Sequence, residues 1–143
     1  PKNLFLSLQP FEDPFEFIQI SNELIQLHEG FQNDMSKAVG KKVFRQSSVG
    51  RIFYFPNASW SRRVSGVFSN QVAREAPEIA HAILVERKNG NFLVGVRAPI
   101  KRPFGADTLC RKFSGGGRAA AAGINNLTKV RVEDFIKAFE DQF

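Results

Sequence analysis

Apolar residues recur at every third or fourth position in the first part of the chain, and this spacing predicts a long amphipathic helix. Asp13 and Pro14 mark its start, because aspartate is a favoured N-cap and proline is tolerated in the first helical turn. Glu16 supplies the partner of a capping box, and Gly40 marks the end. The predicted helix covers residues 13–39. Its apolar stripe consists of Phe17, Ile20, Leu24, Leu27 and Phe31, and Met35 and Ala38 continue it.

Short apolar runs separated by turn residues predict a small β-sheet in the remainder of the chain. Residues 52–55, 80–86 and 92–97 have the short, apolar character of strands. An Asn-Gly pair joins the last two runs and predicts a tight hairpin in which both turn residues take positive φ. A further short strand is predicted near Val43.

The segments between and after these strands predict shorter helices. Ser61 is the expected N-cap of the first, whose inward positions recur every four residues until Pro77 stops it. Trp60, at its start, is expected to pack against the core rather than to bind a ligand. Two more helices are predicted over residues 106–113 and 133–143. The complete order predicts an α/β fold, in which a small mixed β-sheet packed with helices follows one long amphipathic connector helix.

The pattern divides the chain into a connector region, residues 1–40, and a domain, residues 41–143. The sequence opens with Pro1 and its single methionine is Met35, which favours a piece of a longer protein. Cys110 is the single cysteine, so no disulfide framework exists and a reducing compartment, the cytoplasm, is expected. No run approaches the 18 or so apolar residues of a membrane span, so no membrane partner is expected.

The most distinctive segment is residues 113–123, which read FSGGGRAAAAG. The three glycines can take positive φ and can bring their backbone N–H groups close to a ligand. Arg118 follows with a permanent charge and a planar fork that suits phosphate. Residues 119–122 are alanines and predict a short helix, whose N-terminus would add its dipole to an anion site and which Gly123 would end. A tight turn that only allows close packing is the alternative.

Charge is concentrated around this glycine segment. The net charge of the chain is +6, and residues 97–118 hold six basic residues against Asp107 alone, which gives +5. Such a run is more often a solvated face, but its coincidence with the glycines favours an anionic ligand. Arg97 ends the second hairpin strand beside Gly95, which leaves space for another backbone or for a ligand.

The order of these motifs resembles the DHH-associated domain of subfamily 1, the C-terminal half of DHH-family phosphoesterases. A strand that ends in arginine (VGVR) is followed by a helix and by SGGGR with its alanines and closing glycine. The family motif runs Gly-Gly-Gly-His-Pro-x-Ala-Ala-Gly, and residues 115–123 match it without a gap, with Arg118 in place of the histidine and Ala119 in place of the proline. The resemblance spans about residues 50–143. It implies that the substrate's phosphate or 3′ end is held by Arg97, Gly115, Gly116, Gly117 and Arg118, although arginine cannot donate a proton as histidine does.

The resemblance also implies that catalysis belongs to a missing N-terminal DHH domain. That domain would hold two manganese ions with clustered aspartates and histidines, as two-metal chemistry requires. The two histidines here, His28 and His81, are far apart in the sequence, so no catalytic residue, metal ligand or cofactor is assigned to this segment. The expected partners are a nucleotide, oligonucleotide or other phosphate-bearing substrate, the missing DHH domain and a second copy of the chain in a homodimer.

Two other functions stay open at this point. The C-terminal domain of alanyl-tRNA synthetases, a distant relative, also reads Gly-Gly-Gly-Arg, so a non-catalytic RNA- or single-strand-binding module is the alternative. Such modules usually stack bases on exposed aromatic side chains, and Trp60 and Phe104 are the candidates here. The third function is a structural or dimerising domain in which the glycines only pack.

Overall fold

The computed structural model describes residues 5–6, 9–10, 12–13, 15, 18 and 21–143. Helices alternate with pairs of strands along the chain. The strands are β1 (Val43–Gln46), β2 (Gly50–Phe55), β3 (Ala80–Glu86), β4 (Phe92–Arg97), β5 (Gly116–Arg118) and β6 (Ala121–Leu127). The helices are α3 (Asn22–Val39), α4 (Ser59–Glu75), α5 (Ala106–Arg111), the 3-10 turn η1 (Lys129–Arg131) and α6 (Val132–Gln142).

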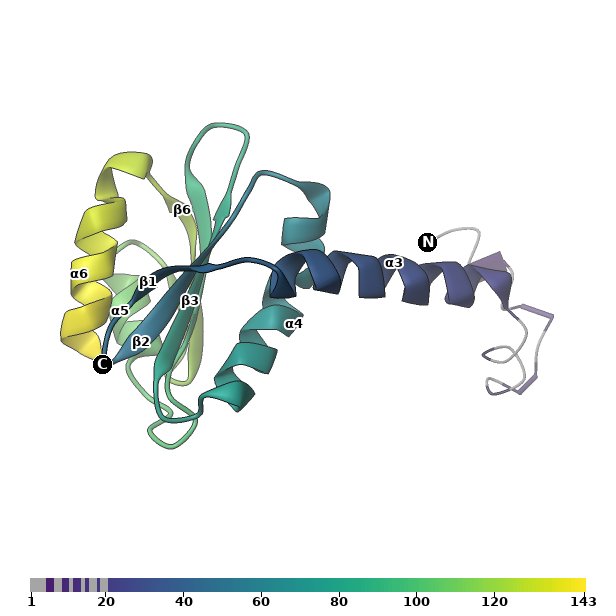
Figure 1. The fold of residues 1–143 in the computed structure, drawn as a ribbon, viewed down its shortest axis with the longest axis horizontal. Coiled ribbons are helices and arrows are strands. Elements are labelled where there is room, and N and C mark those ends of the chain that lie inside the picture. Colours follow the sequence, from purple (N-terminus) through teal and green to yellow (C-terminus); the bar gives the residue numbers. More distant parts are fainter. Residues whose placement is uncertain (1–4, 7–8, 11, 14, 16–17, 19–20) are drawn as a thin grey trace.

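The strands form one six-stranded mixed sheet in the order β1-β2-β3-β4-β6-β5. Strands β2 and β3 are parallel, because α4 carries the chain back between them, and every other neighbouring pair is antiparallel. Helix α4 covers one face of the sheet, and α5 and α6 cover the other (Figure 1). The prediction of a small mixed sheet packed with helices is confirmed. No helix among the described residues is long and apolar enough to cross a bilayer.

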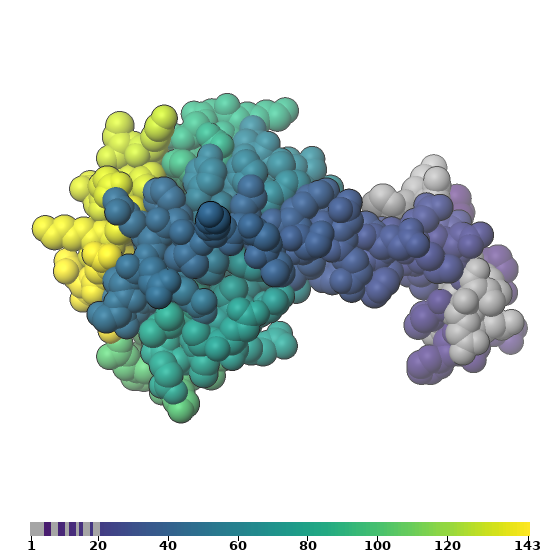
Figure 2. All heavy atoms as spheres, viewed as in Figure 1, coloured from purple at the N-terminus to yellow at the C-terminus, as the bar shows by residue number. Residues whose placement is uncertain are grey.

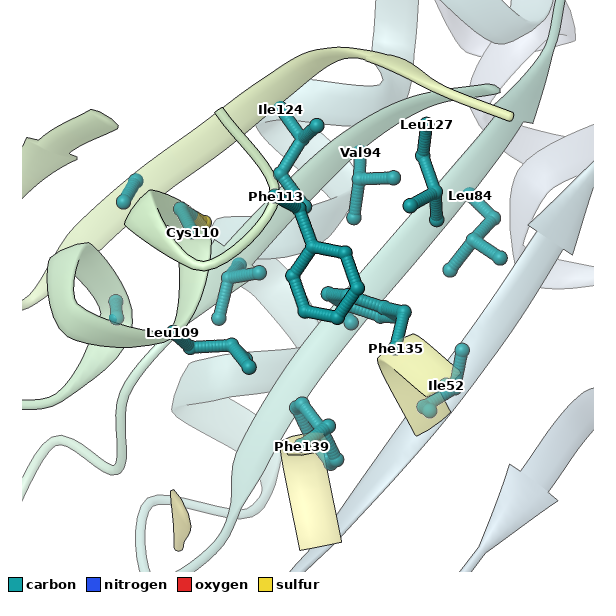
Figure 3. Packing of buried hydrophobic residues seen from close by; sticks show 14 of the residues in the cluster. Ile52, Leu84, Val94, Leu109, Cys110, Phe113, Ile124, Leu127, Phe135 and Phe139 are labelled. Atoms are coloured by element: carbon teal, nitrogen blue, oxygen red, sulfur yellow. The ribbon is translucent and has the colours of Figure 1, made fainter. Parts of the chain in front are cut away.

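Each face of the sheet carries its own core because side chains alternate along the strands. In β4, Phe92, Val94 and Val96 are buried towards α5 and α6, while the residues between them face α4. Phenylalanine rings fill both cores. Figure 3 shows Phe113, Phe135 and Phe139 close together in one core. In the other core, Phe53 and Phe55 of β2 pack against Phe68 of α4.

The hairpin between β3 and β4 forms where it was predicted, but its turn differs. Gly90 has φ 75°, whereas Ser114 is the one non-glycine residue with positive φ in the described part of the chain, so Asn89 keeps a negative φ. Gly90 N–H donates to the Arg87 carbonyl (2.9 Å), and Arg87 N–H donates to the Asn91 carbonyl (2.8 Å). This is a type I turn followed by a left-handed glycine, the arrangement typical of slightly longer hairpin loops.

The connector helix predicted over residues 13–39 is not continuous. Residues Phe15 and Ile18 are helical and the Asp13 carboxylate accepts a hydrogen bond from Phe15 N–H (2.9 Å), but the continuous helix begins only at Asn22. Ser21 is extended and caps α3 by accepting from Leu24 N–H (3.3 Å), so it interrupts the predicted helix. The other residues of the predicted first turns, Pro14, Glu16, Phe17 and Ile20, lie outside the described residues.

The predicted N-cap of α4 is also wrong. The helix begins at Ser59, after an Ala58 cap that makes no side-chain hydrogen bond. Ser61 lies inside the first turn and is fully buried, because the chain turns into the helix as Trp60 packs on Phe55 with ring centroids 5.2 Å apart. The structural role expected of Trp60 is therefore confirmed, and the helix stops at Glu75, two residues before Pro77.

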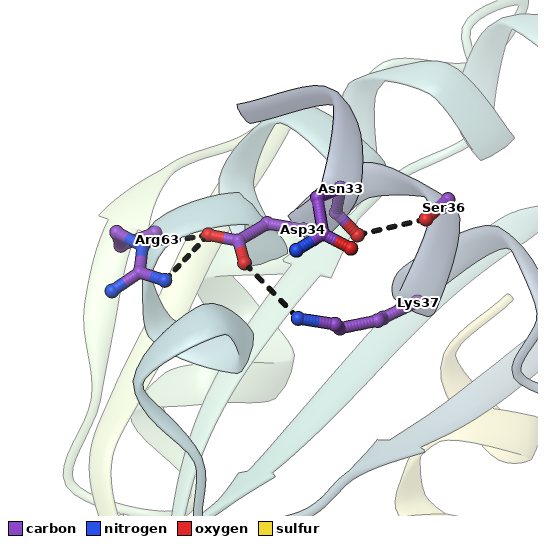
Figure 4. A network of polar contacts seen from close by, with 5 residues as sticks. All are labelled: Asn33, Asp34, Ser36, Lys37 and Arg63. Atoms are coloured by element: carbon purple, nitrogen blue, oxygen red, sulfur yellow. Dashed lines mark hydrogen bonds and ion pairs between the residues drawn. The ribbon is translucent and has the colours of Figure 1, made fainter. Parts of the chain in front are cut away.

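Helix α3 extends away from the domain like an arm (Figures 1 and 2). Its C-terminal part is anchored, because Met35 and Ala38 are buried against the α4 side, whereas Leu27 and Phe31 of the predicted stripe remain 56% and 40% exposed. A polar cluster supports the anchor (Figure 4). The Asp34 carboxylate accepts from Arg63 Nε at 2.7 Å and lies 3.8 Å from Lys37 Nζ.

We expect Arg63→Gln to loosen α3 from the domain without unfolding the sheet. The Asp34 side chain is only 6% exposed, so removing Arg63 leaves a buried carboxylate with weaker pairing. Amide hydrogen exchange over residues 31–39 should speed up several-fold at pH 7, while exchange in β3 stays slow. Arg62→Gln is the matched control, because Arg62 bonds the neutral Asn57 side chain.

The same attachment should weaken in acid. The hydrogen bond from Arg63 lowers the pKa of Asp34 below its ordinary value of 3.8. Because the folded-state pKa is depressed, the stabilisation is complete above about pH 4 and is lost as the pH falls through the lowered pKa. If Arg63→Gln left the amide exchange rate over residues 31–39 unchanged at pH 7, the role of the Asp34–Arg63 pair in anchoring α3 would be contradicted.

Candidate functional site

The glycine segment forms a β-hairpin, and the short helix predicted over residues 119–122 is wrong. Strand β5 turns through Ala119 and Ala120 directly into β6. Four alanines are too few to nucleate a helix, and the turn is fixed from outside: Ala98 N–H donates to the Ala120 carbonyl and Ala106 N–H to the Ala119 carbonyl, both at 3.0 Å. The site therefore has no helix N-terminus here. Gly123 does not end a helix but lies within β6.

Two of the three glycines are required by packing. A Cβ at Gly115 would lie 2.3 Å from the Gly123 carbonyl oxygen, and Gly117 has φ 144° with a Cβ position 2.6 Å from the Ala122 Cα atom. Gly116 differs, since a Cβ there would have no atom within 4 Å. The packing interpretation thus accounts for Gly115 and Gly117, and Gly116 is left facing open space.

The hairpin places bare backbone at the rim of the sheet. Strand β5 is an edge strand, and its three residues are all exposed. An edge strand presents backbone N–H groups that no neighbouring strand pairs. Because Gly116 carries no side chain, an anion can approach this backbone closely.

The structure brings Arg97 and Arg118 to the same face of the sheet. Ala121 of β6 lies directly opposite Arg97 of β4 on one side and opposite Arg118 of β5 on the other. Directly opposed residues of a sheet project from the same face, so the two arginines flank a single alanine. The two guanidinium groups repel one another: the pKa of Arg97 is lowered first by burial and second by the charge of Arg118.

Arg97 is half-buried and is held by neutral groups. Its Nε donates to Asn70 Oδ1 of α4 (3.0 Å), and its Nη1 donates to the Val96 carbonyl (3.3 Å). Neither Arg97 nor Arg118 makes an ion pair with a carboxylate in the described part of the chain. Other cations of the basic run are paired: Arg111 lies 2.9 Å from Asp107 and Lys101 lies 2.6 Å from Glu78.

A cavity of about 340 Å³ opens beside Arg97, between the end of α4 and the tip of the glycine hairpin. Asn70 and Arg74 line it from α4, and Ala120 and Ala121 line it from the hairpin. The sequence reasoning missed Asn70 and Arg74. Their spacing of four residues on one helical face is a signal, but only the packing of α4 onto β4 shows that this face meets Arg97.

A row of basic residues crosses the sheet at the level of Arg97. Arg51 of β2, His81 of β3 and Arg97 of β4 are direct neighbours in the register, and with Arg118 we call them the basic row. His81 is 1% exposed, and its Nε2 lies 3.0 Å from Arg51 Nη2, which makes Nε2 the acceptor and leaves the proton on Nδ1. Burial, followed by the charge of Arg51, lowers the pKa of His81 to about 4. His81 is therefore neutral at pH 7.

No three histidine, cysteine, aspartate or glutamate side chains gather closely enough to hold a metal ion in the part of the chain that the structure describes. Cys110 lies on the buried face of α5, and burial raises the pKa of its thiol to about 11, so it is not a reactive thiolate. The chemistry that this arrangement offers is anion binding by guanidinium groups.

Comparison with known proteins gives relatives of the fold. No family model matches the chain, and no curated protein sequence matches it. Among solved structures, PggH, a pGpG-specific phosphodiesterase from Vibrio cholerae, superposes with a TM-score of 0.65 at 14% identity and covers 99% of this chain. An exopolyphosphatase-related protein from Bacteroides fragilis superposes with a TM-score of 0.55 at 19% identity over 80% of this chain.

The chain spans only part of each of these proteins, 50% of PggH and 34% of the exopolyphosphatase-related protein. Identities this low show a shared fold alone. The chain therefore shares its fold with parts of a phosphodiesterase and of an exopolyphosphatase-related protein.

Proposed function

We propose that this chain is the module of a DHH-family phosphoesterase that binds the phosphate or nucleotide end of the substrate. The observation that carries the proposal is Arg97, a half-buried cation without a carboxylate partner in the described part of the chain, beside a second cation, Arg118. Burying an uncompensated charge costs free energy, and a like charge adds repulsion. A phosphate bound between the two arginines offsets both costs.

Neighbouring groups complete the proposed anion site. Arg74 lies on the rim of the same cavity, and Gly116 offers bare backbone at the sheet edge. Arg118 replaces the family's histidine as a phosphate ligand, but a guanidinium keeps its proton and cannot act as a proton donor as histidine does. Its part is therefore electrostatic binding.

Hydrolysis of a phosphodiester or phosphoanhydride belongs, in this proposal, to a separate DHH domain with manganese. The fraction of PggH that this chain spans, 50%, leaves room in such an enzyme for that second part. A cytoplasmic location and a homodimer remain predictions from the sequence.

A non-catalytic RNA- or single-strand-binding module is the second candidate. The guanidinium groups of Arg97 and Arg118, which have no carboxylate partner among the described residues, favour it, because cationic side chains follow a nucleic-acid backbone. His81 in the middle of the basic row, by contrast, is buried and neutral. The aromatic side chains give this candidate less support. Of the two stacking candidates named from the sequence, Trp60 packs on Phe55, and Phe104, 59% exposed, stays available.

Binding of the dinucleotide pGpG, measured by calorimetry, tests the proposed site. Arg97→Gln and Arg118→Gln should each weaken binding about ten-fold or more, because each removes a charge-assisted bond worth roughly 1.5–3 kcal/mol. Affinity should also fall steeply between about 50 and 200 mM salt. The melting temperature should barely change, since neither guanidinium contributes to a core.

Arg111→Gln is the matched control for this experiment. It removes the same charge from the same basic run, but Arg111 is paired with Asp107 on α5. Equal losses from all three variants would show diffuse charge attraction and contradict a site. No loss from Arg97→Gln or Arg118→Gln would leave the glycine hairpin as packing alone.

A further inference from the structure

A second, smaller cavity adjoins Arg97 on the side away from the glycine hairpin. It measures about 160 Å³ and lies between α4 and the sheet. Its walls include Gly66 and Ser69 of α4 and Leu93 and Gly95 of β4, and Arg97 lines both this cavity and the larger one. We call it the α4–β4 slot. Among the described residues, Arg97 is thus the one that the linings of the two cavities share.

Two glycines line the slot at positions where packing would also allow a side chain. A Cβ at Gly66 would have no atom within 4 Å, and a Cβ at Gly95 would meet only Ser69 Oγ at 4.0 Å. Neither has a positive φ. Glycine in the interior of a helix or strand destabilises it relative to alanine. These two therefore weaken α4 and β4 and preserve empty volume, in contrast to Gly115, where no side chain fits.

The chemistry of the slot suits an uncharged ring. Its side walls are apolar, from Ile83, Val85 and Leu93, and no acidic side chain lines it. Ser69 supplies a polar atom, and because its hydroxyl donates to the Ser65 carbonyl (2.8 Å), the oxygen is left to accept a hydrogen bond. A volume below the 300–1,000 Å³ or so of whole-ligand pockets holds a single ring system.

We propose that the α4–β4 slot receives the nucleobase of the nucleotide whose phosphate lies at Arg97 and Arg118. The inference rests on the proposed phosphate site and adds the substrate class: the module binds nucleotides in preference to polyphosphate or inorganic phosphate chains. Arg97 contacts the phosphate from one cavity while the base lies in the other. Gly66 and Gly95 act as specificity-determining residues, because a side chain at either would occupy the space of the base.

The test compares pGpG with pyrophosphate on the same proteins, by calorimetry. Gly95→Val suits a β-strand and fills the slot, and Gly66→Ala is favoured in a helix, so both variants should fold. Gly95→Val should weaken pGpG binding about ten-fold or more, Gly66→Ala should weaken it less, and pyrophosphate affinity should stay within about two-fold. Circular dichroism and melting temperature check that each variant is folded.

The outcomes separate this inference from the function on which it rests. Unchanged pGpG affinity in folded Gly95→Val overturns the slot, and the phosphate site stands if Arg97→Gln weakens pGpG binding about ten-fold or more. Equal losses for pGpG and pyrophosphate overturn the slot as a base site. If the unaltered protein binds pGpG and pyrophosphate with equal affinity, the slot is likewise overturned as a base site. If neither ligand binds the unaltered protein, the slot and the phosphate site both fail.

Discussion

Gly115→Ala is expected to destabilise the domain by about 3 kcal/mol, at the upper end of the usual cost of overpacking. The new Cβ would lie 2.3 Å from the Gly123 carbonyl oxygen, 2.9 Å from Ile124 Cγ1 and 3.0 Å from the Cys110 carbonyl oxygen. Two of these are backbone atoms in a strand and a helix, so the strain cannot be relieved by rotating a side chain. Urea unfolding followed by Trp60 fluorescence measures the loss.

Gly116→Ala is the matched control, one residue along the same strand. Its Cβ would have no atom within 4 Å, so the free energy of unfolding should change by no more than about 0.5 kcal/mol. Similar losses from both variants would show that the hairpin does not pack as described. The comparison also separates the two uses of the glycines, because only Gly116 is free of a packing requirement.

Acidification should cost the domain about 2–3 kcal/mol through His81 alone. The folded-state pKa is lowered to about 4, mainly by burial and then by Arg51, whereas an unfolded histidine titrates near 6.5. Between these values the unfolded chain binds a proton that the folded chain does not. Stability from this source is therefore complete above about pH 6.5 and is lost as the pH falls towards 4.

Urea unfolding between pH 4 and pH 7 measures this slope. His81→Gln should remove most of it, because glutamine stays neutral and can still accept from Arg51. His28→Gln is the matched control, because it makes the same exchange at an exposed position of α3. A slope that survives in His81→Gln would contradict the assignment of the neutral, buried histidine.

The strands of the sheet were accessible from sequence because their signals are local. Alternation in residues 92–97 assigns Phe92, Val94 and Val96 to one face and Arg97 to the other, and the structure has that arrangement. The position of Arg97 at a strand end beside a glycine follows from the same period of two. Only the resemblance to the DHH-associated domain predicted that Arg118 lies near Arg97, because no local sequence pattern shows that β6 pairs with both β4 and β5.

The errors arose where tertiary contacts outweigh propensity. Alanine favours helices, but residues 119–122 turn and continue as a strand because the backbone of Ala98 and Ala106 bonds their carbonyls. Serine is a favoured N-cap residue, but Ser61 lies inside the first turn of α4, where the neighbouring Trp60 packs on Phe55. The basic row and the α4–β4 slot depend on strand register and on the docking of α4, which no local pattern encodes.

A double-mutant cycle on Arg97 and Arg118, with pGpG as ligand, tests the central claim most directly. If both guanidinium groups hold one phosphate, removing the first leaves little for the second to lose, and the double variant should bind more tightly than the sum of the two losses predicts, by about 1 kcal/mol or more. Additive losses would place the arginines on separate phosphates and contradict a single phosphate site between β4 and β5.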